Sequence, residues 1–294
     1  MGEFRVAPAF EQFCKNLNFS LDSYLAIISR YHSITKRIND DYWDTESDSA
    51  HSLYVGSYGR GTEIEGSDID MLVQLPYDTY VRFNNYAANG QSALLQEVKN
   101  VIAKTYSSTY LKADGQIISV PFSDSITFEV LPAFLNRDGS YTFANSNDGG
   151  SWKITDPKAE IQAITERDKE CNHNLKRLCR MARAWRLAND VGISGILIDI
   201  FAYRFIANWE YNDMSYFYYD EMTRDFMKYV SELPSQDKWK VMGSDRYIYC
   251  SGNFRRKAKE AYDLAVEAIE CYKKYPSSAN DKWREIYGSK FPKL

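Results

Sequence analysis

The chain has 294 residues, of which 44% are hydrophobic, and its formal net charge at pH 7 is −4. This length and composition predict a globular protein with one large domain or two smaller ones. The acidic balance disfavours a role centred on a long nucleic acid, because such domains usually carry a basic excess. No signal peptide is evident, and the longest apolar run, residues 193–209, contains Asp199 and Arg204. We therefore expect a cytoplasmic protein without a membrane span.

Five cysteines are present, and none of them forms a CxxC pair. An odd number of cysteines without the spacing of a disulfide framework is typical of a reducing compartment, so we expect free thiols. Cys171, His173 and Cys179 could be considered as zinc ligands, but their spacing matches no standard zinc site.

The N-terminal half of the chain mixes helical and strand patterns. Residues 8–40 carry apolar side chains at intervals of three or four, which predicts helix. A second helix is predicted at 92–106, a turn at 136–139 and a linker at 146–150. Short β-rich runs predict strands at 52–55 (SLYV), 69–75 (IDMLVQL), 117–122 (IISVPF), 126–134 (ITFEVLPAF) and 140–144 (SYTFA).

After residue 156 the pattern is helical nearly to the end of the chain. Helices are predicted at 158–170, 172–189, 193–210, 220–231 and 254–274. The expected fold class is α+β, with a mixed β-sheet and N-terminal helices in residues 1–155. A helical domain in residues 156–294 follows, and we expect ligands to bind in the cleft between the two.

Two aspartates, Asp68 and Asp70, open the second predicted strand. The apolar side chains from Ile69 to Leu75 alternate with them, so both carboxylates should lie on the face opposite the core. They are about 7 Å apart along a strand and can reach a common cation; without it they repel and at least one pKa rises. A solvated edge strand would show the same pattern, whereas the spacing of a calcium loop is absent.

Glu129 stands on the polar face of the predicted strand at 126–134. If this strand lies beside the first, three carboxylates converge in a manner that suits two Mg²⁺ ions and an in-line displacement at phosphate. A lone glutamate on a strand is also often no more than an exposed side chain.

A glycine-rich turn, VGSYGRGT at 55–62, precedes the aspartate pair. It is neither a Walker A loop nor a dinucleotide-binding GxGxxG, because the lysine and the spacing are missing. Backbone N–H groups of Gly56 and Ser57 could approach a phosphate closely, and the Ser57 hydroxyl adds a donor.

Together these motifs resemble the polymerase-β-like nucleotidyltransferases. GSYGRGT followed by SDID resembles their GS…[DE]h[DE] signature, and FEVLPAF resembles the third-acid strand of the oligoadenylate and cyclic GMP–AMP synthases. The chain is most similar to the bacterial counterparts, the cyclic GMP–AMP synthase/DncV-like CD-NTases of antiphage signalling, and within them to clade E. The resemblance implies that Asp68 and Asp70 bind two Mg²⁺ ions, or Mn²⁺. Glu129 is the implied third acid, which binds one metal and helps activate the attacking hydroxyl.

The predicted helix at 172–189 carries a stripe of cations, Lys176, Arg180 and Arg183. Such a stripe is usually a solvated helix face. However, LKRLCRMARAW resembles the helix that holds the donor triphosphate in this family, which implies that Arg180 and Arg183 bind phosphate. Ser194 occupies a position that relatives use near the nucleotide, although a plain N-cap serine would account for it equally well.

The activity that the resemblance implies is the joining of two NTPs into a cyclic dinucleotide second messenger, with release of pyrophosphate. The text Arg183-Ala-Trp185 resembles an element of relatives that prefer UTP or CTP. No long nucleic-acid activator and no membrane are expected, and a separate effector protein would read the product. Two alternatives stay open: nucleotidyl transfer to RNA, an antibiotic or a protein, and an inactive nucleotide-binding module.

Overall fold

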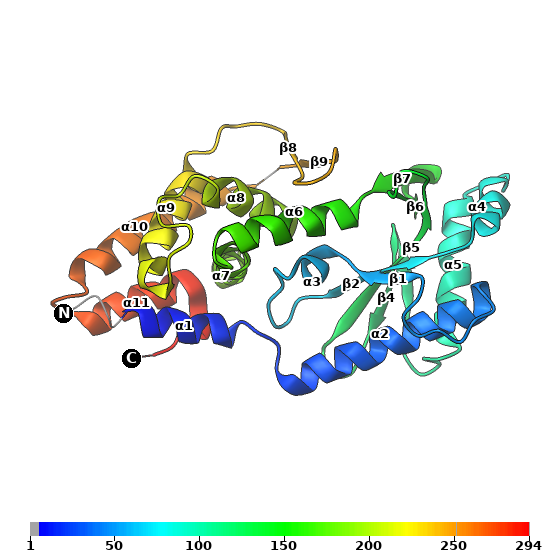
Figure 1. The fold of residues 1–294 in the computed structure, drawn as a ribbon, viewed down its shortest axis with the longest axis horizontal. Helices are drawn as coiled ribbons and strands as arrows, with labels where there is room; N and C mark the ends of the chain where they lie inside the picture. Colours follow the sequence, from blue (N-terminus) through cyan, green and yellow to red (C-terminus); the bar gives the residue numbers. More distant parts are fainter. Residues whose placement is uncertain (1–5, 251, 294) are drawn as a thin grey trace. The chain divides into compact units, whose positions relative to one another are not determined.

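The computed structural model describes residues 6–250 and 252–293. Its elements form two compact units, neither of which is continuous in the sequence. The first, here called the sheet unit, comprises residues 19–60 and 66–161. The second, the helical unit, contains the first helix, the short segment 61–65 and the chain from residue 162 onward. Figure 1 labels the elements of both units.

The sheet unit is built on a seven-stranded mixed sheet in which β5 pairs with three other strands. Its neighbours are β2, which is parallel to it, and β4 and β6, which are antiparallel and share its other edge. The remaining pairs, β1 with β2, β3 with β4 and β6 with β7, are antiparallel. The strands are β1 (Ser52–Tyr54), β2 (Ile69–Gln74), β3 (Lys112–Asp114), β4 (Ile117–Pro121), β5 (Thr127–Leu135), β6 (Tyr141–Asn145) and β7 (Ser151–Thr155).

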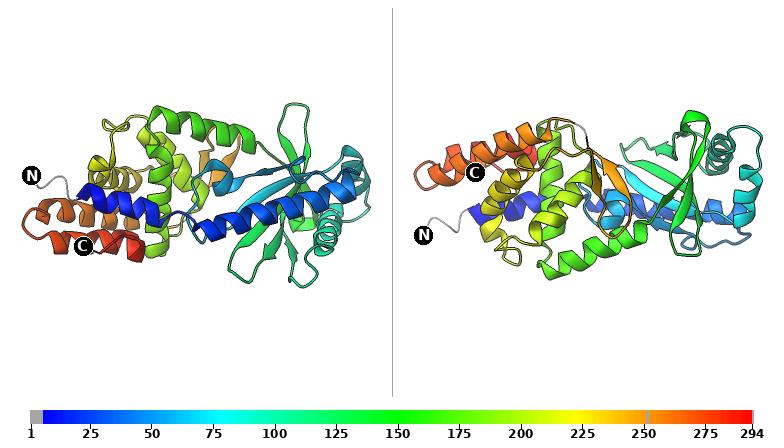
Figure 2. Two further views of the ribbon diagram at one scale, coloured as in Figure 1. Left: turned by 60° about the horizontal axis from the view of Figure 1, so that its bottom comes forward. Right: turned by 90° about the horizontal axis from the view of Figure 1, so that it is seen from above.

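One face of this sheet packs against helices. Ile69, Met71 and Val73 of β2 are fully buried in a core that also includes side chains of α2 and α5, which confirms the predicted alternation along β2. The long helix α2 runs along this face in Figure 2. The helices of the unit are α2 (Leu21–Tyr42), the short α3 (Gly56–Arg60), α4 (Tyr77–Asn84) and α5 (Gly90–Ala103).

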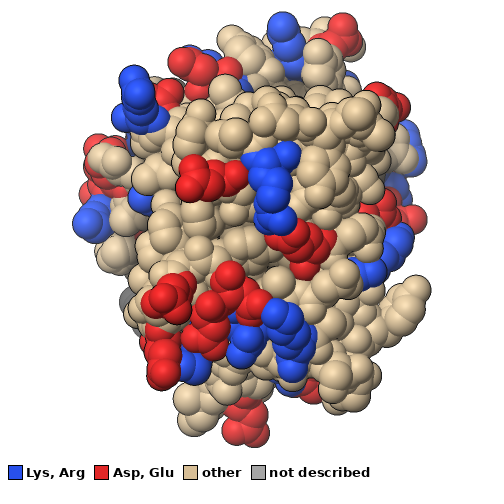
Figure 3. Space-filling model, turned by 90° about the vertical axis from the view of Figure 1, so that its right-hand side faces the viewer, with Lys and Arg blue, Asp and Glu red and all other residues tan. Residues whose placement is uncertain are grey.

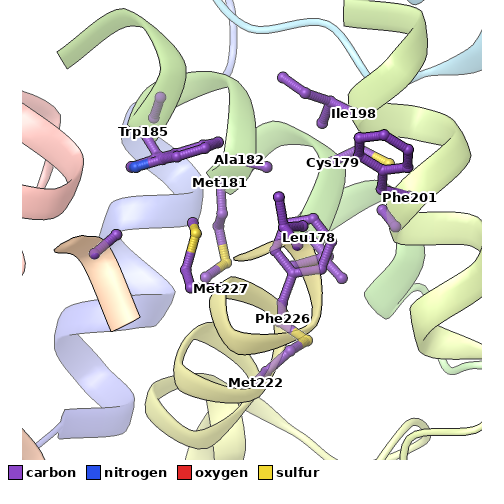
Figure 4. Packing of buried hydrophobic residues seen from close by; sticks show 14 of the residues in the cluster. Leu178, Cys179, Met181, Ala182, Trp185, Ile198, Phe201, Met222, Phe226 and Met227 are labelled. Carbon is purple, nitrogen blue, oxygen red and sulfur yellow. The ribbon is translucent and has the colours of Figure 1, made fainter. Parts of the chain in front are cut away.

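The core of the helical unit forms around α7. Its apolar stripe includes Leu178 and Trp185, and it packs against Phe201 of α8 and Phe226 of α9 (Figure 4). The elements that contribute to this unit are α1 (Val6–Asn16), α6 (Pro157–Glu170, whose first turn lies in the sheet unit), α7 (Asn174–Ala188), α8 (Gly195–Ile206), η3 (Tyr216–Tyr218), α9 (Tyr219–Ser231), β8 (Lys238–Lys240), β9 (Tyr247–Tyr249), α10 (Phe254–Cys271), α11 (Pro276–Tyr287) and η4 (Gly288–Lys290).

Two predictions about local structure were wrong, and two helices were missed. The helix expected at 8–40 is two helices, because the Ser20 side chain accepts a hydrogen bond from the Ser23 N–H and begins α2 anew. The linker expected at 146–150 is the turn between β6 and β7, with a 3-10 helix at Asn147–Gly149. The helices α4 and α11 were not predicted. The division at residue 155 stays a prediction; by contacts, α1 and residues 61–65 group with the later helices.

Charged side chains are mixed on the face of the molecule shown in Figure 3, where acidic and basic groups lie next to one another without a wide patch of one sign. The five cysteines are free thiols, as predicted. None of the helices within residues 6–250 and 252–293 is long and apolar enough to cross a membrane.

Candidate active site

The parallel pairing of β2 and β5 places Asp70 directly opposite Glu129. Their carboxyl groups lie within hydrogen-bonding reach of each other, and such a bond requires a proton on one of the two. Asp68 immediately precedes β2 and is exposed, and its charge acts on both partners. The expectation that these two strands are neighbours is therefore confirmed, and the three acids lie on one side of the sheet.

Burial and mutual repulsion disfavour the ionised forms of these acids. Burial raises the pKa of Asp70 to about 6, with a further rise from Asp68 and opposing effects from the Arg60 charge and the Ser57 N–H. Burial also raises the pKa of Glu129 to about 7, and the charges of Asp70 and Asp68 add to the shift. The pKa of Asp68 is also raised, through partial desolvation of its carboxyl group, although the residue as a whole is exposed. The charge of Arg60 does not offset these effects, so further positive charge would stabilise the ionised acids.

The donor set of this cluster suits a hard divalent cation. Carboxylate oxygens are the ligands that Mg²⁺ and Mn²⁺ prefer, and a cation would relieve the repulsion that the raised pKa values record. Across the described part of the chain, no three His, Cys, Asp or Glu side chains are grouped so that they could hold a metal ion by themselves, and this includes Asp68, Asp70 and Glu129. An open arrangement fits Mg²⁺, which is usually bound by one or two carboxylates together with substrate phosphates.

Metal binding should depend on pH because a cation competes with protons for the carboxylates of Asp70 and Glu129. Their pKa values of about 6 and about 7 predict that Mn²⁺ affinity rises between about pH 5 and 7 and levels off above about 8. Calorimetric titration in buffers of different ionisation enthalpy would measure both the affinity and the protons released. A pH-independent affinity would contradict this expectation.

The predicted glycine turn is the short helix α3, and it supports Asp70. Gly56 has a φ of +57°, and a Cβ built there would lie 1.9 Å from Oδ2 of Asp70. The backbone N–H of Ser57 donates to the Asp70 carboxylate. A glycine is therefore required at position 56 because the Asp70 carboxylate lies too close for a side chain. The predicted role of Gly56 and Ser57 in phosphate binding is a separate reason for the same residue.

Substituting Gly56 by alanine should displace Asp70 and reduce activity by at least about tenfold, because misplacement of a catalytic group by 1 Å is already costly. The matched control is Gly139→Ala. Gly139 has a φ of +90°, and a Cβ added there would meet nothing within 4 Å, so this variant carries the backbone strain without the clash. Turnover and thermal unfolding of both variants would test this. Equal activities in the two variants would contradict the account.

Arg183 is placed differently from the prediction. The residue is 5% exposed, and its guanidinium forms an ion pair with the fully buried Asp199, with Nη2 2.9 Å from Oδ2. It also donates to the carbonyl oxygen of Gly195 at 3.1 Å. Thr62 donates to the same Asp199 carboxylate at 3.0 Å. These contacts are at odds with a role for Arg183 as a phosphate ligand, since its charge is already balanced inside the core.

The other predicted phosphate ligands lie nearer the surface of the helical unit. Arg180 donates to Glu63 at 3.0 Å and to Asn18 at 3.2 Å. Ser194 is exposed, and its side chain makes no capping bond to α8. Lys176, which the prediction did not assign to phosphate, lies within 3.3 Å of a Cβ built on Gly61. The sequence placed Lys176 in the cation stripe, but it did not indicate that Arg183 is the buried member of that stripe.

The mixed sheet, the acids on its neighbouring strands and the helices that follow define the fold class of the polymerase-β-like nucleotidyltransferases. The chain belongs to the SMODS family, described as the Second Messenger Oligonucleotide or Dinucleotide Synthetase domain, whose model matches residues 5–168.

Two named relatives are similar to the chain. It is 21% identical over 258 residues to a cyclic AMP-AMP-AMP synthase from Acinetobacter sp., with 83% of this chain and 73% of the relative covered. It is 24% identical over 182 residues to a probable cyclic nucleotide synthase from Bacillus cereus, with 56% of this chain and 51% of the relative covered. Both names agree with synthesis of cyclic nucleotides.

Solved structures of CD-NTases share the fold. CdnC from E. coli, solved with ATP, is 16% identical to this chain with a TM-score of 0.63. The match covers 97% of this chain and 98% of the CdnC chain. The Vibrio cholerae di-nucleotide cyclase DncV is 14% identical with a TM-score of 0.66 and covers 99% and 88%. These likenesses confirm the predicted resemblance to CD-NTases. The assignment to clade E stays a prediction.

Proposed function

We propose that this chain joins nucleoside triphosphates into a cyclic oligonucleotide second messenger and releases pyrophosphate. In each step a 2′ or 3′ hydroxyl of one nucleotide attacks the α-phosphate of another, and a last step closes the ring. The observation that carries the proposal is the register of β2 and β5, which pairs Asp70 with Glu129 beside Asp68. This set of acids suits phosphoryl transfer, and the SMODS match agrees with it.

The three acids are the residues that would hold divalent metal, Mg²⁺ or Mn²⁺. Such ions, when bound, neutralise charge that develops on phosphate oxygens during in-line displacement. Glu129 is the carboxylate that we assign to accept the proton of the attacking hydroxyl, because its pKa lies near 7. Gly56 and the Ser57 N–H hold Asp70 in place for this arrangement.

Phosphate binding is assigned to the surface of the helical unit. We assign Lys176, which lies beside Gly61, as a phosphate ligand together with the predicted Arg180, and Ser194 as a further donor. Arg183 instead positions α7 against α8. Lys176→Gln is expected to raise the KM for NTP several-fold with little change in kcat, because a charge-assisted contact to phosphate is lost. The exposed Lys169 of α6 offers the control: Lys169→Gln should leave KM unchanged, and an equal effect would contradict the assignment.

Ring size and bases are finer questions. We expect a cyclic dinucleotide and a role in antiphage signalling through a separate effector. The preference for UTP or CTP that the resemblance implies for Arg183-Ala-Trp185 gains no support from the fold, because the side chains of Arg183 and Trp185 are both buried in the helical unit. The name of the Acinetobacter relative adds a cyclic trinucleotide as a second candidate product.

Nucleotidyl transfer is tested by labelling the two ends of the triphosphate separately. With NTP labelled at the α-phosphate, label should enter a phosphatase-resistant product; with label at the γ-phosphate, it should leave as pyrophosphate. Label attached to RNA or protein would instead favour transfer to another acceptor. Release of inorganic phosphate alone, or binding without turnover, would contradict the proposal.

A further inference from the structure

A small cavity of about 210 Å³ opens on the helical unit, where α1, α7 and η3 meet. Its lining includes three cations, Lys15, Arg177 and Arg180, and it contains no carboxylate. Asn18 and Tyr216 also line it and add an amide and a phenolic hydroxyl. Apart from Arg180, none of these residues belongs to the site assigned above. The lining is therefore both polar and strongly positive.

Arg177 is the least balanced of the three cations. It is half-buried, and its Nη1 donates only to neutral acceptors: the Asn172 carbonyl at 3.3 Å, Oδ1 of Asn174 at 3.4 Å and the Tyr219 hydroxyl at 3.3 Å. The guanidinium lies 5.0 Å from the ring centre of Tyr216. No Asp or Glu within the described ranges forms an ion pair with it. A partly buried charge without a counter-charge is unfavourable, so an anion from solution would be attracted to this place.

The other two cations already have carboxylate partners outside the cavity lining. Arg180 forms an ion pair with Glu63 at 3.0 Å, and Lys15 forms one with Glu11 at 2.7 Å. The Nε of Arg180 is buried and has no hydrogen-bond partner. Two acids thus offset three cations, and the uncompensated charge lies at Arg177. Like charges this close repel one another unless an anion lies between them.

The two remaining titratable groups of the lining, Cys14 and Tyr216, add no negative charge, because burial raises the pKa of each. Burial raises the pKa of the Cys14 thiol to about 12, against the lowering effect of Arg177 and Arg180, so the thiol is neutral at physiological pH. The cavity is also smaller than the roughly 300–1,000 Å³ of sites that hold drug-sized ligands. Its size suits one or two phosphoryl groups rather than a whole nucleotide.

We propose that the cavity between α1, α7 and η3 binds a phosphoryl anion, held by Arg177, Lys15 and Arg180 with Asn18 and Tyr216 as further donors. The anion is either free, as phosphate or pyrophosphate, or the terminal part of a nucleotide triphosphate. Guanidinium groups suit this ligand because they offer paired N–H donors in a planar fork. Binding here needs no divalent metal and no turnover, so it stands apart from the proposed reaction at Asp68, Asp70 and Glu129.

The test is calorimetric titration of pyrophosphate into the full chain in the presence of EDTA. Saturable binding is expected, and its affinity should fall as salt is added. Arg177→Gln should weaken it at least about tenfold, on the scale of a charge-assisted hydrogen bond. Arg177 also contacts Asn174, so its substitution could disturb the fold. A second variant, Lys15→Glu, therefore reverses the charge of a side chain that is 60% exposed. It should weaken pyrophosphate binding to a similar extent without unfolding the protein.

The matched control is Lys169→Glu, which makes the same charge change on an exposed residue of α6 that does not line the cavity. Equal affinities for Lys15→Glu and Lys169→Glu, or no pyrophosphate binding at millimolar concentration, would overturn the proposal. Parallel titrations with ATP and AMP identify the source. If ATP binds in a manner that depends on Lys15 and AMP does not bind, the ligand of the cavity is the triphosphate tail of a nucleotide. If pyrophosphate binds and ATP does not, the ligand is the free anion.

Discussion

The Asp70→Asn variant is expected to lose nucleotidyl transfer by at least about 100-fold and, without divalent metal, to unfold at a higher temperature than the wild type. Burial raises the pKa of Asp70 to about 6, so its ionised form is disfavoured in the folded chain. Asparagine keeps an acceptor for the Ser57 N–H and gains a donor toward Glu129. Because Asp70 is only partly enclosed, we expect a gain of about 1–2 kcal/mol, equivalent to a few degrees.

The pH dependence of this gain follows from the direction of the shift. The pKa of Asp70 is raised on folding, so its contribution to stability is fully present below about pH 4 and is lost as pH rises through about 6. The difference between variant and wild type should therefore be absent near pH 4 and reach its full size above about pH 7. Thermal unfolding in EDTA across this range would measure it.

The control for this prediction is Asp114→Asn, a neutralisation in the same sheet. Lys112 lowers the pKa of Asp114, so neutralising it should bring no gain in stability at any pH. A gain that is equal in both variants, or an Asp70→Asn variant that is less stable at neutral pH, would show that the acid cluster is not electrostatically strained.

The second large effect is expected at the buried ion pair of Arg183 and Asp199. Asp199→Asn leaves the guanidinium of Arg183 charged and unpaired in the core, which should cost about 3–5 kcal/mol. For a unit of this size the unfolding temperature should fall by roughly 10 °C. Replacing both partners, as Arg183→Met with Asp199→Leu, should cost less than the single change, since no buried charge is then left alone.

The double variant also separates a structural role of Arg183 from a role in binding phosphate. If Arg183 serves mainly to join α7 to α8, the folded double variant should keep its KM for NTP within a few-fold of the wild type. A KM raised more than about tenfold, in a variant shown to be folded, would instead support the phosphate contact expected from the resemblance.

Much of the fold could be predicted because its signals are local. The alternation from Ile69 to Val73 marks one buried sheet face, and the apolar stripe that ends at Trp185 marks a packed helix. The break at Ser20 was missed because apolar spacing continues across it, while the start of α2 depends on a single capping bond. Side-chain periodicity does not report such a bond.

The candidate site divides in the same way. Asp70 and Glu129 each lie on the polar face of a strand whose apolar residues alternate in the sequence. They converge because β2 and β5 are neighbours in the sheet. The roles of Arg183 and Gly56 were not visible, because each depends on a partner brought by tertiary packing: Asp199 on α8 and the carboxylate of Asp70. Helical spacing placed three cations on one face without indicating that one of them meets a buried acid.

The central claim is tested most directly by a mass spectrum of the products formed from a mixture of all four NTPs with Mg²⁺, after phosphatase treatment. The account predicts a phosphatase-resistant cyclic oligonucleotide from the wild-type chain, whose mass gives the bases and the ring size, and none from Asp70→Asn. Product formation that is undiminished in Asp70→Asn, or the absence of a cyclic product with either Mg²⁺ or Mn²⁺, would contradict it.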